Sequence, residues 1–378
     1  MIGMAINGTA ASDSLWGSDG SDLINGYEGN DKEYGQGGDD RLDGGNGRDY
    51  LEGNDGNDTI YGGADTDHLV GGTGADHLNG GAGEDYIEGG QGADVMDGGD
   101  TSTLNYIAYR NSTAGVTINL ETHTASGGEA TGDSFVNFQN IDGSPHDDNL
   151  TGNSGTNMLY GGAGNDTISG GGDYDYLYGQ DGNDVMRGGS GSTYFGDDFD
   201  GGNGNDTVTY TESNVGVTVN LATGKGSGGN AALDEYISVE NVNGSAGGDA
   251  LIGNGGANTL DGWAGRDTLT GGGGADRFNF SSIAHTTVGQ ADTISDFSRA
   301  EGDKVVLTAI DANTGVAGNQ AFSFIGSGLY THHAGELRYA DRGGGHVTIA
   351  GDVNGDGASD FHIELYGASH LAASDFVL

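Results

Sequence analysis

The sequence has no cysteine, one proline and only 12 lysine and arginine residues in a chain of 378. Without cysteine there are no disulfides and no cysteine nucleophile, which fits an exported protein that does not rely on disulfides. Against the few basic residues stand 57 acidic ones, so the formal charge is −45 and nucleic acid or an anionic membrane would be repelled. No stretch approaches the roughly 18 apolar residues of a membrane span. Residues 1–12 lack the basic and apolar segments of a secretory signal peptide.

The sequence also lacks the short motifs of common enzyme classes. It contains no H-E-x-x-H helix, no G-x-S-x-G elbow and no phosphate-binding loop. The closest histidine pair, His332 and His333, is followed by Glu336 at a spacing that metalloproteases do not use. His68 and His77 occupy a repeat position that we expect to face solvent. Carboxylates are too frequent for a catalytic pair to stand out, and we predict no intrinsic enzymatic activity.

What the sequence does contain is glycine, 80 residues of it, in a regular pattern. Residues 8–97 form ten consecutive nonapeptides with glycine at position one, often two, and four, aspartate at six and usually an apolar residue at eight. A flexible glycine-rich linker has no reason to keep aspartate and leucine in phase through ten units. The sixth-position aspartates of this stretch are Asp13, Asp22, Asp31, Asp40, Asp49, Asp58, Asp67, Asp76, Asp85 and Asp94.

The pattern suits a metal-binding solenoid. Glycines at positions one, two and four allow positive-φ turns that aim carbonyl oxygens inward. Calcium takes six to eight oxygen ligands, which turn carbonyls and one carboxylate per turn can supply. Two nonapeptides would make one coil of roughly 18 residues with a short strand on each side. Asp49 should then stack over Asp67 and Asp85, and Asp40 over Asp58 and Asp76, with an ion between stacked turns.

These nonapeptides resemble the calcium-binding repeats of the RTX (repeats-in-toxin, hemolysin-type) family. The resemblance implies an all-β fold, a right-handed parallel β-roll or β-helix solenoid, and multiple Ca²⁺ ions, about a dozen or more. The expected side-chain ligands beyond the first stretch are Asp148, Asp166, Asp175, Asp184, Asp206, Asp249, Asp267 and Asp276. The expected carbonyl ligands include those of Gly44, Asn46, Gly53, Asp55, Gly62, Ala64, Gly71, Thr73, Gly80, Ala82, Gly161 and Ala163.

Three departures interrupt the first stretch. Glu33 takes an eighth position that is otherwise apolar, Asp65 replaces the fourth glycine of its repeat, and Ala11 does the same in the first repeat. Together they predict a frayed N-terminal end and one weaker calcium site.

Two copies of a different segment interrupt the repeats further along. Residues 101–142 contain alternating apolar residues such as Val116, as in a half-buried strand. Residues 210–243 repeat this segment at a constant offset of 101, so that Tyr109 matches Tyr210. Each insert is too short for a separate globule, and we expect it to widen one coil of the solenoid. The predicted division is a first roll (1–100), an insert (101–142), a second roll (143–209), a second insert (210–243), a third roll (244–279) and a C-terminal cap (280–378).

After Phe278 glycine becomes sparse, and strand-like segments follow, including Asp292-Thr293-Ile294 and Phe322-Ser323-Phe324. These segments, with the ending Asp375-Phe376-Val377-Leu378, resemble the C-terminal domain of serralysin-type secreted proteases. The resemblance implies a cap on the solenoid and an ending that a type I (ABC) exporter of a Gram-negative cell recognises. Similar modules occur in mannuronan C5-epimerases, so the resemblance names no activity.

One loop of the cap has a calcium-loop spacing of its own. Asp352, Asn354, Asp356 and Asp360 follow an EF-hand-like D-x-N-x-D-G-x-x-D order, which suits calcium. The twelfth position is Ile363 instead of the bidentate glutamate. A polar turn between two strands is the alternative.

The sequence therefore predicts a secreted, extracellular, non-catalytic calcium-binding protein of a Gram-negative bacterium. It should be unfolded at the low calcium inside the cell and folded at the millimolar calcium outside it. One alternative is an adhesin or matrix protein that binds extracellular polysaccharide through Tyr109, Tyr210, Tyr174 and Tyr176. Another is the accessory C-terminal part of a secreted protease or epimerase. If Met1 is the natural start, the chain is a whole small protein, and a fragment is the alternative.

Overall fold

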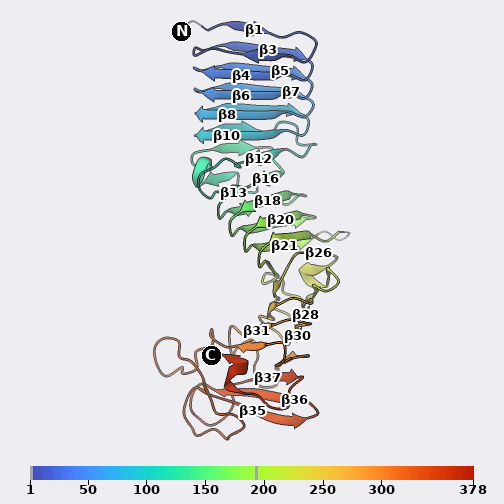
Figure 1. Cartoon of the computed structure of the whole chain (residues 1–378), viewed down its shortest axis with the longest axis vertical. Coiled ribbons are helices and arrows are strands. Elements are labelled where there is room, and N and C mark those ends of the chain that lie inside the picture. Colours follow the sequence, from blue (N-terminus) through green and yellow to red (C-terminus); the bar gives the residue numbers. More distant parts are fainter. Residues whose placement is uncertain (1–2, 192–194) are drawn as a thin grey trace. The chain divides into compact units, whose positions relative to one another are not determined.

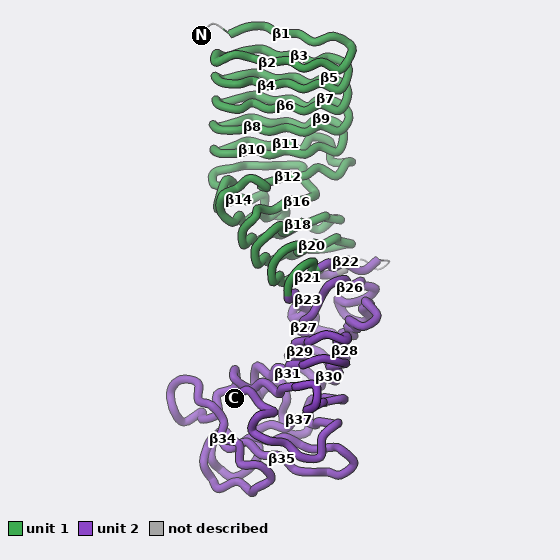
Figure 2. The backbone as a smooth tube through the Cα atoms, in the orientation of Figure 1, with its two compact units in different colours: residues 1–188, 201–204 green, residues 189–200, 205–378 purple. Residues whose placement is uncertain are grey.

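The computed structural model describes residues 3–191 and 195–378. Among these residues the regular elements are short β-strands and three 3-10 turns, with no α-helix, so the predicted all-β class is confirmed. None of the described residues belongs to a helix long and apolar enough to cross a membrane. Two compact units are distinguished in Figure 2. Unit 1 comprises residues 1–188 and 201–204, and unit 2 comprises residues 189–200 and 205–378.

Unit 1 begins as stacked coils with a parallel strand on each side (Figure 1). Strands of neighbouring coils pair with a shift of 18 residues, so Ile24 pairs with Leu42 and Leu51 with Leu69. The predicted two nonapeptides per coil are therefore confirmed. The first sheet contains β1 (Ala5–Asn7), β3 (Leu23–Glu28), β5 (Arg41–Asn46), β7 (Thr59–Ala64), β9 (His77–Ala82), β11 (Val95–Asp97) and β15 (Ser134–Val136). The second contains β2 (Ser14–Trp16), β4 (Lys32–Gly37), β6 (Tyr50–Asp55), β8 (His68–Gly74), β10 (Tyr86–Gly92), β12 (Tyr106–Ala108), β16 (Asn140–Asp142), β18 (Met158–Ala163) and β20 (Tyr176–Asp181).

The core of these coils is narrow. A strand such as Thr59-Ile60-Tyr61 alternates polar, apolar and polar, so only its middle side chain points inward. The inward residues are fully buried, as at Leu42, Leu51, Ile60 and Leu69. With about one apolar side chain per strand, burial of the core alone contributes little stability per coil.

On the outer face of the second sheet, aromatic side chains stack from coil to coil. His68 is half-buried between the rings of Tyr50 and Tyr86, whose centroids lie 5.1 and 4.9 Å away. The predicted solvent-facing position is therefore only partly correct for His68, whereas His77 is exposed.

The first insert replaces one sheet and leaves the other continuous. Within the second sheet, β12 pairs with both β10 and β16, so pairing proceeds without interruption. The first sheet ends at β15, which pairs with β11. A third sheet then begins, with β14 (Thr124–Ser126) antiparallel at its edge and η1 (Gly128–Ala130) following in the chain. Its other strands are β13 (Thr117–Asn119), β17 (Asn149–Thr151), β19 (Thr167–Asp173) and β21 (Val185–Gly191).

Unit 2 repeats this plan. One set of its strands comprises β23 (Thr207–Thr209), β27 (Asn241–Asn243), β29 (Thr259–Asp261), β31 (Arg277–Asn279), β33 (Lys304–Val306) and β38 (Phe376–Val377). The others are β22 (Asp198–Asn203), β24 (Thr218–Asn220), β25 (Lys225–Ser227), β26 (Glu235–Ile237), β28 (Ala250–Ile252), β30 (Thr268–Thr270) and β32 (Asp292–Ile294), with η2 at Gly229–Ala231. Every element from β12 to β17 has its counterpart from β23 to β28 at an offset of 101 residues, which confirms the predicted duplication.

The C-terminal segment extends both sets of strands in unit 2. An antiparallel meander of β35 (Glu336–Gly343), β36 (His346–Asp352) and β37 (Phe361–Tyr366) joins β32 through β37, and β34 (Ser323–Phe324) pairs with β35. After η3 (Ala373–Asp375), β38 pairs with β33. Edge strands that would otherwise end the coils are thus covered, as expected of a cap.

Candidate metal centre

The sixth-position aspartates of successive coils form two ladders along unit 1. In each, one carboxylate oxygen accepts a hydrogen bond from the backbone N–H of the aspartate one coil earlier, as Asp49 Oδ1 does from Asp31 at 2.8 Å. The other steps have lengths of 2.7–2.9 Å. The predicted stacking is confirmed, and the ladders run through Asp31, Asp49, Asp67 and Asp85 and through Asp40, Asp58, Asp76 and Asp94.

The second oxygen of these carboxylates, Oδ2, is buried without a hydrogen-bond partner. Asp58, Asp76 and Asp85, for example, are 0% exposed. A buried carboxylate oxygen without a partner is costly, especially when it is ionised. Each such oxygen is therefore a position at which a cation would be stabilising. The aspartates of the predicted set with this property are Asp31, Asp40, Asp49, Asp58, Asp67, Asp76, Asp85, Asp94, Asp166, Asp267 and Asp276.

Each of these oxygens points into a small space beside the first glycine of its own repeat. A methyl group built on Gly44 would lie 2.5 Å from Asp49 Oδ2 and 2.8 Å from the carbonyl oxygen of Gly62, one coil further on. At Gly62 the distances to Asp67 Oδ2 and the Gly80 carbonyl oxygen are both 2.5 Å. Only glycine keeps this space free, and the oxygens that converge on it are those that calcium prefers. We call a glycine space that faces an unpartnered carboxylate oxygen an open rung. A carbonyl oxygen of the next coil is among the nearest atoms at Gly26, Gly35, Gly44, Gly53, Gly62, Gly71 and Gly161, whereas at Gly80, Gly89, Gly262 and Gly271 the nearest atoms belong to the aspartate.

The predicted carbonyl ligands divide into two groups. The first-position carbonyls of Gly44, Gly53, Gly62, Gly71, Gly80 and Gly161 each face the glycine space of the preceding coil. The third-position carbonyls of Asn46, Asp55, Ala64 and Thr73 instead accept backbone hydrogen bonds of 2.8–3.1 Å from that coil. Ala82 and Ala163 have the same strand register. No three His, Asp or Glu side chains converge among the described residues, which is consistent with rungs built largely from carbonyl oxygens.

Burial changes the acidity of the ladder carboxylates. It raises the pKa of Asp67 to about 8 and the pKa values of Asp40 and Asp76 to about 7. The main cause is removal from water; the hydrogen-bonded backbone N–H opposes it, and neighbouring ladder carboxylates add to it. The ionised ladder is therefore unfavourable without a compensating cation.

In four predicted ligands Oδ2 accepts a hydrogen bond from a nearby serine or threonine of the chain. We call the rungs of these aspartates closed. Asp148 Oδ2 accepts the N–H of Ser144 at 2.5 Å, while Oδ1 accepts the Ser144 hydroxyl and the Val116 N–H, both at 2.7 Å. Asp249 makes the same contacts with Ser245. A serine or threonine at position two, which no open rung has, is the sequence signal that we overlooked. The remaining closed rungs are Asp13 with Thr9 and Asp22 with Ser18.

Asparagine takes the place of aspartate at two further positions. Asn157 Nδ2 donates to the carbonyl oxygen of Gln139 at 2.6 Å, and Asn258 Nδ2 donates to that of Glu240 at 2.8 Å. Each amide thus supplies a hydrogen bond to the coil before it and needs no cation.

The inserts contribute ladder members that the repeat pattern did not reveal. Asp133 Oδ1 accepts the N–H of Asp94 at 2.9 Å, and its Oδ2 accepts the hydroxyl of Tyr109 at 3.0 Å. Asp234 has the same relation to Tyr210, at 2.6 Å. Tyr109 and Tyr210 are 0% and 4% exposed, so the predicted saccharide contact through these two tyrosines is wrong.

The cap contributes two more aspartates to the ladders. Asp292 Oδ1 accepts the N–H of Asp267 at 2.8 Å, and Asp303 Oδ1 accepts that of Asp276 at 3.0 Å. We overlooked both because they lie 25 and 27 residues further on instead of 18, although each still precedes an apolar residue by two. The other predicted ligands also make hydrogen bonds between coils. Asp175 Oδ1 accepts the backbone N–H of Asn157, Asp184 Oδ1 accepts that of Asp166, and the backbone N–H of Asp206 donates to the Glu240 side chain.

The EF-hand-like loop is a tight polar turn between β36 and β37. Asp352 accepts the backbone N–H groups of Gly355 and Gly357 at 2.6 and 2.8 Å. Asp360 accepts the N–H of Val353 at 2.7 Å and the side-chain amide of Asn354 at 2.9 Å. The carboxylates of Asp352 and Asp360 thus accept hydrogen bonds from donors of their own loop. The unpartnered carboxylate oxygen that marks an open rung is therefore missing here. The side-chain amide of Asn354 and the backbone of Asp356 take part in the same turn.

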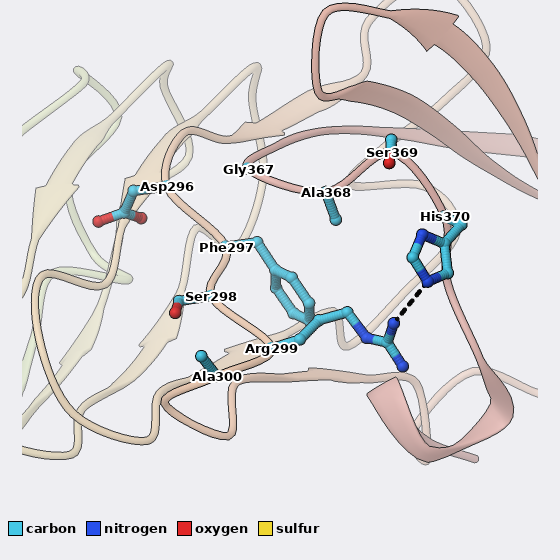
Figure 3. A pocket seen from close by; sticks show the side chains of 9 residues that line it. All are labelled: Asp296, Phe297, Ser298, Arg299, Ala300, Gly367, Ala368, Ser369 and His370. Atoms are coloured by element: carbon cyan, nitrogen blue, oxygen red, sulfur yellow. Dashed lines mark hydrogen bonds between the residues drawn. The ribbon is translucent and has the colours of Figure 1, made fainter.

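A hollow of about 480 Å³ in unit 2 lies beside the C-terminal residues (Figure 3). Arg299 Nε donates to Asp375 Oδ1 at 2.9 Å, and another guanidinium nitrogen lies 3.0 Å from His370 Nε2. The contact that the structure gives His370 in this hollow is with Arg299. The polar groups of the hollow hold the end of the chain in place.

Comparison with known families agrees with this geometry. The family model of the RTX calcium-binding nonapeptide repeat (4 copies) matches residues 5–32, 34–69, 70–101, 142–177, 160–195 and 177–208. The family model Peptidase M10 serralysin C terminal matches residues 197–378. No curated protein matches the chain.

Proposed function

We propose that this chain, which matches the RTX calcium-binding nonapeptide repeat model and the serralysin C-terminal model over separate regions, is a secreted, non-catalytic protein whose solenoid folds on calcium outside the cell. Both matched regions are accessory regions and not catalytic ones. The observation that carries the proposal is the row of buried, unpartnered Oδ2 atoms at the open rungs.

Coil stacking and ion binding depend on the same side chains. Each ladder aspartate holds the preceding coil through Oδ1 and presents Oδ2 to its rung, as Asp49 does for Asp31. The chain carries a formal charge of −45 and its coils have a narrow core, so the ionised chain should not compact by itself. Bound calcium supplies two positive charges per rung. Folding and ion uptake are then one coupled event.

This coupling would keep the chain unfolded where calcium is scarce. An unfolded chain can pass through a type I exporter, with Asp375-Phe376-Val377-Leu378 as the proposed signal. In folded unit 2, Phe376 is buried and pairs with Val305, while Asp375 is held by Arg299. The signal would therefore be accessible before folding and covered after it.

We further propose that ions bind at open rungs only. In the closed rungs, as at Asp148 and Asp249, donors of the chain already occupy Oδ2. At Asn157 and Asn258 the amide supplies a donor instead of a carboxylate oxygen. The number of ions should accordingly be smaller than the number of patterned aspartates.

The test is a calcium titration of the purified chain, starting from excess chelator, followed by far-UV circular dichroism and small-angle scattering. We expect a cooperative gain of β signal together with compaction, and little response to an equal concentration of magnesium, which keeps its waters more tightly. A chain that is already folded in chelator, or that stays expanded in millimolar calcium, would contradict the proposal.

A further inference from the structure

Glu33 is the one acidic residue at the inward eighth position of the first roll. In β4 it pairs with Leu15 on one side and Leu51 on the other, so it stands in a column of apolar side chains. It is 0% exposed, and neither carboxylate oxygen makes a hydrogen bond of normal geometry, although the backbone N–H of Asp43 interacts with the carboxyl group. No ion pair of Glu33 occurs among the described residues. Such a side chain needs a compensating partner.

The side chain is aimed at the rung of its own repeat. A methyl group built on Gly26 would lie 2.6 Å from the Gly44 carbonyl oxygen and 2.9 Å from Glu33 Oε1, with Asp31 Oδ2 also in contact. Asp31 Oδ2 is itself without a partner. Two carboxylates and a carbonyl therefore converge on one point.

Neighbouring rungs lack this second carboxylate. The atoms nearest to the equivalent point at Gly35 belong to Asp40 and Gly53, and those at Gly44 belong to Asp49 and Gly62. Their eighth positions are Leu42 and Leu51, which have no oxygen to offer.

We propose that Glu33 is a direct ligand of the metal ion at the Gly26 rung, which makes this rung a two-carboxylate calcium site. The inference rests on the proposed function, because it assumes that open rungs take calcium. It reverses the expectation that the Glu33 departure weakens the repeat. Since affinity for calcium rises with the charge of the ligand set, this rung should bind more tightly than its single-carboxylate neighbours. It would anchor an N-terminal end at which the rungs of Asp13 and Asp22 are closed.

The experiment compares the full chain with Glu33→Gln, Glu33→Leu and Glu28→Gln by calcium binding in competition with a chromophoric chelator. Glu28 is exposed in the same repeat, so Glu28→Gln makes the same charge change away from the rung. We expect both Glu33 variants to weaken the tightest class of sites about tenfold or more, because one of two charged ligands is lost. Glu28→Gln should leave that class unchanged.

A different result is expected if Glu33 is an unpaired buried acid that stays protonated. Glu33→Gln would then bind calcium like the wild type, and Glu33→Leu would raise the urea midpoint in saturating calcium because Leu15 and Leu51 favour an apolar neighbour. That pair of results would overturn the inference. If Glu33→Leu does not fold, Glu33→Gln decides alone, since it preserves the shape of the side chain. A wild-type chain that takes up no calcium would instead refute the proposed function.

Discussion

At the scale of single residues, one carboxylate oxygen separates open from closed rungs. Asp58 and Asp148 share the sixth repeat position, yet Asp58 Oδ2 has no partner whereas Asp148 Oδ2 accepts the N–H of Ser144. The pattern of aspartates alone does not distinguish them. The second residue of each repeat does, because a serine or threonine there can turn its donors onto the carboxylate.

The first prediction concerns this difference. Asp58→Asn should lower the bound calcium by about one ion, because one of the rung's oxygen ligands loses its charge. The fold should persist, since the amide oxygen can still accept the N–H of Asp40. Asp148→Asn is the matched control, and it should leave the ion count unchanged while costing about 1–3 kcal/mol through a lost acceptor. Equilibrium dialysis and urea unfolding measure the two quantities. Equal ion losses in both variants would count against ion binding at open rungs only.

A second prediction concerns the tyrosine whose hydroxyl donates to the ladder carboxylate of the first insert. Tyr109→Phe removes the hydroxyl that donates to Asp133 Oδ2 at 3.0 Å and leaves a buried carboxylate oxygen unpaired. We expect a loss of about 1.5–3 kcal/mol in the free energy of unfolding in calcium. Tyr61→Phe, at a more exposed ring, should change it by less than about 0.5 kcal/mol. Equal urea midpoints for Tyr109→Phe and the wild type would show that Asp133 finds another donor.

At the scale of elements, the strands of the repeats were predictable and the course of the inserts was not. Ile60 and Leu78 lie in three-residue polar, apolar, polar segments at fixed spacing, and this determines both the strand and its register. The widening of the coil stays a prediction, and no local pattern shows that β15 ends one sheet while β13 begins another. That change depends on contacts between distant residues, such as the pairing of Thr117 with Asn149.

The third prediction tests the glycine space of a single strand and its turn. Gly44→Ala places a methyl group 2.5 Å from Asp49 Oδ2 and 2.8 Å from the Gly62 carbonyl oxygen, too close for either. We expect a loss of about 1–3 kcal/mol from crowding, together with the loss of that rung's ion. In Gly37→Ala the nearest atoms lie 3.8–3.9 Å away, so this control should keep the ion. Calcium binding unchanged in Gly44→Ala would mean that the ion occupies another position.

At the scale of the whole molecule, composition sets the conditions for folding. A chain with 33% hydrophobic residues and a formal charge of −45 has little apolar surface to bury and strong self-repulsion. The aspartates of the repeats predicted a bound cation, and the type of fold followed from their period. The additional ladder members Asp292 and Asp303 could not be predicted from that period, because the cap reaches the same ladder after longer loops.

Protons should partly replace calcium in the metal-free chain. The pKa values of Asp40, Asp67 and Asp76 in the folded state, about 7, 8 and 7, lie above the unfolded value of about 3.9. Between those limits the folded chain binds more protons than the unfolded one, so this contribution is complete below about pH 4 and is lost as the pH rises to about 8. Circular dichroism of calcium-free protein should therefore show β signal that falls as the pH rises through this window. Saturating calcium should flatten the dependence near neutral pH, because the ionised carboxylates are then compensated. A metal-free β signal that increases with pH would show that these aspartates are ionised in the folded coils without any cation.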